Sequence, residues 1–164
     1  MTRRIANLVG LIACTGLMAY ALYSQHVLGY EPCPLCVFQR VGVIALGGVF
    51  LLAALHNPPG GARYVYVLGV VLAAGSTIAV AGRHVYLQNL PADQVPACGA
   101  GLDFLLETTP FLDVLRLVFT GSGECAEVDW TLLGFSMPVW VVIAAVALGV
   151  AGVWANWLLP ARST

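Results

Sequence analysis

The chain alternates between long apolar runs and shorter polar segments. Four runs approach the roughly 20 apolar residues that a helix needs to span a bilayer core of about 30 Å. They cover about residues 5–23, 37–55, 64–82 and 137–159. Only the second run contains a charge, Arg40 near its start. The pattern predicts an all-α membrane protein, a bundle of four transmembrane helices joined on one side by two outer loops, residues 24–36 and 83–136.

The composition points the same way. The 164 residues are 60% hydrophobic and only 9% charged, with a mean hydropathy of +0.88, whereas soluble domains carry about 25% charged residues. No internal repeat or low-complexity tail is visible. We expect residues 1–164 to form a single integral membrane domain whose surroundings are the lipid bilayer, with no nucleic acid as a partner.

The first apolar run has an alternative interpretation. Arg3 and Arg4 precede it and Ala19-Tyr20-Ala21 ends it, which also fits a secretory signal peptide with a small-residue cleavage site. Gln25 and His26 follow soon afterwards, as a short loop requires. A retained first helix is therefore the preferred interpretation.

Charge predicts the orientation of the four helices. With four spans, both termini and the 56–63 connection share one side, which holds four arginines and no acidic residue. All eight Asp and Glu residues fall in the two outer loops. Because basic residues stay on the cytoplasmic side, we expect cytoplasmic termini.

Four of the five cysteines then lie in the outer loops, on the side of the membrane where disulfides persist. These are Cys33, Cys36, Cys98 and Cys125. The fifth, Cys14, lies in the middle of the first run, and we expect it to be an inert packing residue.

The second outer loop contains its own amphipathic stretch, "FLDVLRLVFTG". Asp113, Arg116 and Thr120 recur at spacings of three and four among apolar residues. Such a narrow polar stripe predicts a short helix lying in the membrane interface. The alternative is a buried helix within a folded loop. We favour the interfacial helix because the loop is too small to bury so many apolar side chains.

The outer-loop cysteines allow three interpretations. A zinc site would need a second closely spaced pair, but Cys98 and Cys125 are far apart in sequence, so we expect no metal. The second interpretation is two structural disulfides that staple the two loops. A disulfide between Cys33 and Cys36, however, would close a very small ring and gain little loop-closure entropy. A pair of this kind is better suited to opening and closing, which favours redox chemistry.

The neighbours of Cys36 support a redox dithiol. A helix N-terminus or a nearby cation favours the thiolate, which is the reactive form of cysteine. We expect the second helix to begin near Cys36, with Arg40 four residues further on the same face. In the alternative interpretation, Arg40 only extends its charged group to the membrane interface.

The segment "RHVYLQ", residues 83–88, is a candidate electron-acceptor site. His84 and Gln88 lie one helical turn apart at the end of the third helix, where an imidazole or amide can hydrogen-bond a carbonyl of a lipid-soluble quinone. The alternative is that both side chains only cap the helix end in the headgroup region.

Together these motifs resemble the DsbB family, the quinone-dependent disulfide-generating proteins of the bacterial inner membrane. "CPLCVFQR" carries the family's C-x-x-C with an arginine four residues after the second cysteine. "RHVYLQ" is similar to its quinone segment after helix three, and "PACGAGLDF" and "GSGECAEVDWTLLGFSMPVW" resemble the surroundings of its second cysteine pair. The resemblance covers nearly the whole chain.

The resemblance implies a direction of electron flow. A reduced periplasmic thioredoxin-like partner of the DsbA type would attack Cys98 of a Cys98–Cys125 disulfide. Cys125 would then exchange with Cys33, which leaves a Cys36 thiolate beside a membrane quinone, ubiquinone or menaquinone. Arg40 would stabilise that thiolate, with His84 and Gln88 on the quinone side. The alternative function is a non-catalytic membrane protein with two structural disulfides that binds a periplasmic partner.

Overall fold

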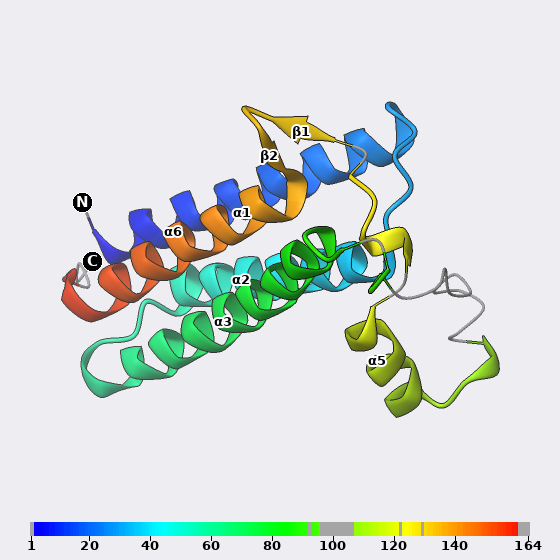
Figure 1. Ribbon diagram of the computed structural model, residues 1–164. Helices are drawn as coiled ribbons and strands as arrows, with labels where there is room; N and C mark the ends of the chain where they lie inside the picture. The colour runs from blue at the N-terminus through cyan, green and yellow to red at the C-terminus, as the bar shows by residue number, and fades with distance from the viewer. Residues whose placement is uncertain (1, 92, 96–106, 122, 129, 161–164) are drawn as a thin grey trace.

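Four long helices form the body of the protein, shown in a computed structural model (Figure 1). The structure describes residues 2–91, 93–95, 107–121, 123–128 and 130–160. The helices are α1 (Arg3–His26), α2 (Pro34–His56), α3 (Arg63–Gln88) and α6 (Met137–Leu158). Each is long and apolar enough to cross a membrane, so the predicted all-α bundle of four membrane helices is confirmed.

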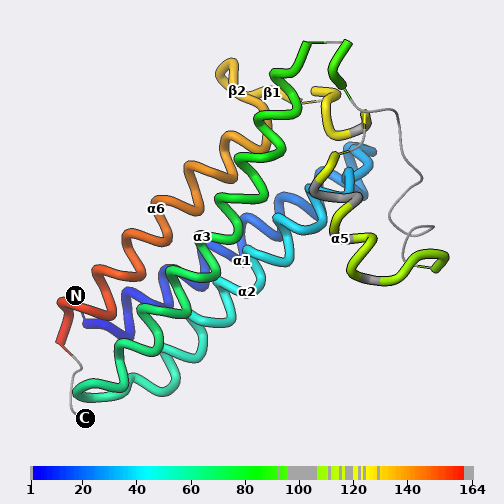
Figure 2. The backbone as a smooth tube through the Cα atoms, turned by 60° about the horizontal axis from the view of Figure 1, so that its bottom comes forward, coloured from blue at the N-terminus to red at the C-terminus, as the bar shows by residue number. Residues whose placement is uncertain are grey.

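Each helix of the bundle packs mainly against two neighbours. α1 and α3 both contact α2 and α6. The interior of the bundle is centred on Phe50, Leu46 and Val70, and Cys14 packs into the same cluster, so its predicted burial is confirmed. Both termini lie at one end of the bundle, and the short helix α5 (Phe111–Thr120) lies at the other (Figures 1 and 2).

Three helices, α1, α2 and α3, extend further than their apolar runs predicted, and the extensions of α2 and α3 carry the motifs of interest. α2 begins at Pro34 because proline has a fixed φ and needs no hydrogen-bond partner at the first helical position. α3 continues to Gln88, past the predicted end at residue 82. Its last two turns contain Arg83 and His84, which end the apolar run without ending the helix. The third helix therefore carries the whole "RHVYLQ" segment out of the apolar span.

The connections contain short elements that the apolar pattern did not predict. Between α2 and α3, Asn57 takes the left-handed conformation at φ 36° and a 3-10 turn, η1 (Gly60–Ala62), follows. Before α6, β1 (Thr131–Leu132) and β2 (Phe135–Ser136) pair as an antiparallel hairpin. Leu133 and Gly134 both have positive φ, as a two-residue type I′ turn requires.

The predicted short helix of the second outer loop is present as α5 (Phe111–Thr120). Its polar residues Asp113, Arg116 and Thr120 are exposed, whereas Val114 is fully buried. Val114 packs into a cluster with Leu35 of α2. Among the described side chains of α5, Val114 is thus the one buried against the end of the bundle. The position of the helix in a membrane interface stays a prediction.

The end of the bundle that holds the termini is fixed by buried polar side chains. The Arg3 guanidinium donates to the carbonyl oxygens of Pro58 (2.7 Å) and Leu159 (2.8 Å). One turn further, the amides of Asn7 and Asn156 donate to each other at 3.1 and 2.9 Å. These bonds join α1 to α6 and to the α2–α3 connection.

Replacing Asn7 by leucine tests this connection. The substitution leaves the Asn156 amide buried without its partner, and we expect the free energy of unfolding in detergent to fall by about 1–2 kcal/mol. Replacing Asn7 and Asn156 together by leucine removes both polar groups, so the double variant should lose less than the sum of the single losses. Strictly additive losses in this double-mutant cycle would contradict the pairing.

Candidate active site at the start of α2

The dithiol is built into the first turn of α2. Cys33 is the N-cap residue, with an extended backbone at φ −63° and ψ 162°, and Pro34 is the first helical residue. The Cys33 Sγ accepts the backbone N–H of Cys36 at 3.3 Å, and the two sulfur atoms lie 2.9 Å apart. The free N–H groups of a helix start favour negative charge. The predicted position of the dithiol at the helix N-terminus is thus confirmed, with Cys33 itself as the cap.

His84 lies directly against both sulfur atoms. Its Nε2 is 3.8 Å from Cys33 Sγ and its Nδ1 is 3.9 Å from Cys36 Sγ. The imidazole is buried, with 3% of its surface exposed. The extension of α3 beyond its apolar run is what brings this side chain to the start of α2. The structure therefore groups His84 with the dithiol, two motifs that are far apart in the sequence.

Gln39 is a site residue that the sequence analysis missed. Its Nε2 lies 2.9 Å from His84 Nδ1, and both side chains are buried. An amide nitrogen only donates hydrogen bonds, so with the Gln39 amide in this orientation Nδ1 is the acceptor, which corresponds to the tautomer that carries its proton on Nε2. That nitrogen faces Cys33. Gln39 thus fixes which face of the imidazole meets the sulfur atoms.

Cys125 also lies at the dithiol. It ends a 3-10 turn, η2 (Gly123–Cys125), and is 1% exposed. It packs in one apolar cluster with Leu35 and Leu87, and Cys33 contacts the same cluster. Three of the four predicted redox cysteines therefore meet at one end of the bundle. The fourth, Cys98, lies outside the described residues.

Arg40 follows the dithiol by one helical turn, as predicted, but its guanidinium turns toward α1. It donates to Gln25 Oε1 and to the carbonyl oxygen of Ala21. A guanidinium has five N–H donors, more than these two bonds use.

Gln88 lies one turn beyond His84 but bonds to the second outer loop. Its Oε1 accepts the Ser136 hydroxyl at 2.7 Å, and its Nε2 donates to the carbonyl oxygen of Glu127 at 3.4 Å. Nearby, Arg83 donates to the carbonyl oxygen of Thr120 at 3.0 Å. In the structure, Gln88 therefore holds the segment that follows Cys125, and its predicted quinone contact stays a prediction.

The site also has the residue types of a partial metal site. Ligand atoms of Cys33, Cys36 and His84 lie within 4.8 Å of one another. A structural zinc site takes four ligands, and Gln39 already occupies His84 Nδ1. The expectation of no metal remains a prediction. What the geometry favours is thiol–disulfide exchange, since that reaction needs sulfur atoms that can approach one another.

Comparison with known proteins agrees with this chemistry. Residues 3–155 match the family described as "Disulfide bond formation protein DsbB". A protein of Nitrosococcus oceani named "Disulfide bond formation protein B" is 51% identical over 146 residues, covering 89% of this chain and 86% of its own length. A protein of the same name from Chromobacterium violaceum is 48% identical over 162 residues, covering 99% and 96%.

Gly121 offers a test of how Cys125 is held. It has φ +92°, and an added Cβ would lie 2.5 Å from Leu87 Cδ1. Gly121→Ala should therefore cost about 1–2 kcal/mol in backbone strain, in addition to the clash, and push the loop off α3. We expect Cys125 in the reduced protein to react with a maleimide about 5–30-fold faster, measured by mass spectrometry of its peptide.

Gly134→Ala is the matched control. Gly134 has a similar φ of +83°, but an added Cβ there meets nothing within 4 Å. It should leave Cys125 protected. Equal labelling rates for Gly121→Ala and the parent protein would show that Gly121 does not hold the loop against Leu87.

Proposed function

The chain belongs to the DsbB family, and we propose that Cys33 and Cys36 are the dithiol through which it passes electrons from protein thiols to a membrane quinone. As a member of that family it is an inner-membrane thiol–disulfide oxidoreductase that takes part in disulfide bond formation. The observation that carries the proposal is the meeting of Cys33, Cys36 and Cys125 beside His84. We further propose that residues 1–164 form one integral membrane domain, with the termini on the cytoplasmic side.

The proposed reaction begins on the second outer loop. A thiolate of a DsbA-type periplasmic partner attacks Cys98 of a Cys98–Cys125 disulfide, and Cys125 leaves as a thiolate. The partner's second thiolate then displaces Cys98, so the partner leaves oxidised and the loop pair is reduced. Each exchange forms one S–S bond and breaks another, so two electrons move inward through mixed disulfides.

The second exchange takes place at the start of α2. The Cys125 thiolate attacks Cys33 of a Cys33–Cys36 disulfide, and Cys36 leaves as a thiolate. The burial of Cys125 in the cluster that Cys33 contacts supports this step, because the two residues are already held at short range. The Cys98 thiolate then displaces Cys33 from Cys125, which restores the loop disulfide and leaves Cys33 and Cys36 as a dithiol. His84 Nε2 faces Cys33, and an N–H there would stabilise the Cys33 thiolate as it leaves.

The residues beside Cys36 fit a quinone. Cys36 and Arg40 are half-buried and one turn apart, and Val41, which follows Arg40, exposes a large apolar side chain. A ligand with polar carbonyl groups and an apolar body matches such a surface. When bound, a quinone accepts two electrons and two protons. Arg40 would then hydrogen-bond a carbonyl oxygen, with His84 and Gln88 as further candidates on the same side.

The cysteines give the first test of this function. Serine in place of Cys33, Cys36, Cys98 or Cys125 should each abolish quinone reduction by purified protein supplied with a reduced dithiol partner, because every exchange needs a sulfur. Cys14→Ser, far from the site, should keep the parent rate. Turnover at the full rate in any outer-loop variant would favour the alternative of structural disulfides.

Arg40 gives the second test. Arg40→Met removes the charge near Cys36 and the proposed bond to the quinone, worth about 1.5–3 kcal/mol for a hydrogen bond to a charged group. We expect the KM for quinone to rise by about 10-fold or more, while the mixed disulfide with the partner still forms. Arg40→Lys keeps a charge, so its KM for quinone should lie between those of the parent protein and Arg40→Met. A KM equal to that of the parent protein would mean that Arg40 only anchors α2 to α1.

A further inference from the structure

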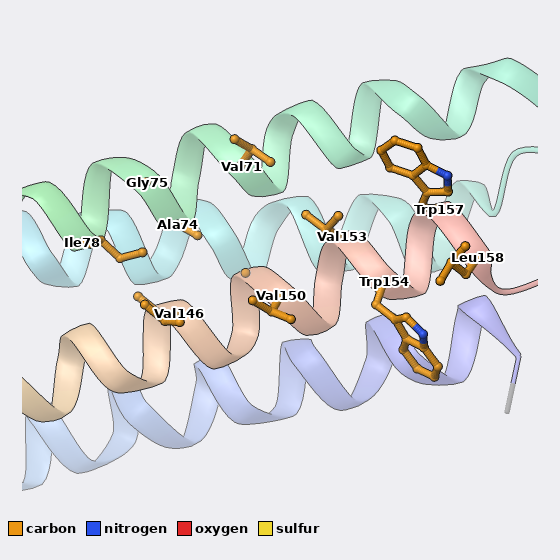
Figure 3. A pocket seen from close by; sticks show the side chains of 12 residues that line it. Val71, Ala74, Gly75, Ile78, Val146, Val150, Val153, Trp154, Trp157 and Leu158 are labelled. Atoms are coloured by element: carbon orange, nitrogen blue, oxygen red, sulfur yellow. The ribbon is translucent and has the colours of Figure 1, made fainter.

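An open apolar cavity lies between α3 and α6, away from the dithiol. It has a volume of about 640 Å³. Its walls include Gly75 and Ile78 of α3 and Val146, Val150 and Trp157 of α6 (Figure 3). Gly75 has no side chain to fill the space beside α3, and a Cβ added there would meet nothing within 4 Å. The cavity is therefore a lengthwise groove on the membrane-facing surface of the bundle.

The groove has the length of one membrane leaflet. It runs along α6 from Val146 to Leu158, which is about 18 Å at 1.5 Å per residue. Half of a bilayer core is about 15 Å. Trp157 and Leu158 lie in the last turn of α6, at the end of the bundle that holds both termini (Figure 1). In the proposed orientation the groove therefore lies in the cytoplasmic leaflet and ends before the part of the bundle that holds the cysteines.

Two arginines flank the cytoplasmic mouth of this groove. The Arg63 guanidinium lies 5.1 Å from the ring centroid of Tyr64 and donates to its hydroxyl, and Tyr64 in turn meets the edge of Trp157. Arg3 bonds the carbonyl oxygen of Leu159, next to the groove residue Leu158. The charges of Arg3 and Arg63 are close enough to repel each other.

This end of the protein lacks a negative side chain to balance the arginines. The sequence has no Asp or Glu before Glu31, between Glu31 and Asp93, or after Asp129. The Arg63 Nε is shielded from solvent and has no hydrogen-bond partner among the described residues. A basic mouth above an apolar groove on the cytoplasmic side matches the charge of an anionic lipid headgroup.

We propose that the α3–α6 groove binds one acyl chain of an anionic phospholipid of the cytoplasmic leaflet, with its phosphate at Arg63. A second copy of the chain fits less well. Two copies related by an axis along the membrane normal would bring their Arg3 and Arg63 charges to the same depth at the contact. The tail of a quinone fits less well because the groove opens at the end opposite Cys36.

Tryptophan quenching can test this site without measuring turnover. The full chain carrying Trp130→Phe and Trp140→Phe keeps only Trp154 and Trp157, both at the groove. It is placed in phosphatidylcholine vesicles that contain a minor fraction of brominated phosphatidylglycerol or, in the other arm, brominated phosphatidylcholine. We expect the quenching to show a preference of about fivefold for the anionic lipid, which is what roughly one arginine near anionic lipid contributes.

Two further variants separate the headgroup from the chain. Arg63→Gln should remove the preference for phosphatidylglycerol while both brominated lipids still quench. Gly75→Leu should fill the groove and lower quenching by both. Gly48→Leu on α2, where an added Cβ also meets nothing within 4 Å, lies outside the groove and should change neither result.

Three results would overturn the proposal. Equal quenching by the two lipids in the parent protein would mean that the groove holds bulk lipid without selection. Relief of quenching by added quinone would assign the groove to the quinone tail. Loss of a dimer in Gly75→Leu but not in Gly48→Leu would assign it to a second copy of the chain.

Discussion

The chemistry of this protein depends on where α2 begins. In hydrocarbon every backbone polar group needs a partner within the helix, so reactive groups that must meet thiols from water are placed at helix ends. Cys33 caps α2, Pro34 starts it, and Cys36 follows within the same turn. The pair is thereby fixed at the end of a candidate membrane helix, where the helix N-terminus favours a thiolate. Everything else at this end is arranged around that turn.

The His84–Gln39 bond makes the arrangement specific. It joins α3 to α2 through two buried polar side chains, and an unpaired polar group there would be costly. The bond therefore sets the rotation of both helices as well as the orientation of the imidazole. Since Nδ1 is taken by Gln39, only the Nε2 side of His84 faces Cys33. A histidine that is free to rotate would offer the dithiol either a donor or an acceptor.

The sequence was sufficient for the features that depend on local pattern. Apolar runs predicted the four spans, and the spacing from Cys36 to Arg40 placed both on one face of α2. Gln39 could not be recognised in this way, because its partner is 45 positions away and the bond exists only once α2 and α3 pack. The contacts of the Gln88 side chain were missed for the same reason, because its partner Ser136 is the N-cap residue of α6 and is distant in sequence. The hairpin before α6 had a local signal, the Leu133-Gly134 turn, but its strands have only two residues each.

The two ends of the bundle differ in the contacts that hold them, and the proposed reaction depends on this difference. At the end that holds the termini, Arg3 and the Asn7–Asn156 pair join the helices through buried hydrogen bonds. At the other end, the loop with Cys125 is held by the burial of Val114 and Cys125 and by single bonds such as Ser136 to Gln88. A hydrogen bond contributes about 0.5–1.5 kcal/mol and a buried valine about 1.5–3 kcal/mol. Because each of these contacts contributes so little, we expect the loop to open locally more readily than the bundle itself. The proposed exchange requires this, since Cys125 must reach both Cys98 and Cys33.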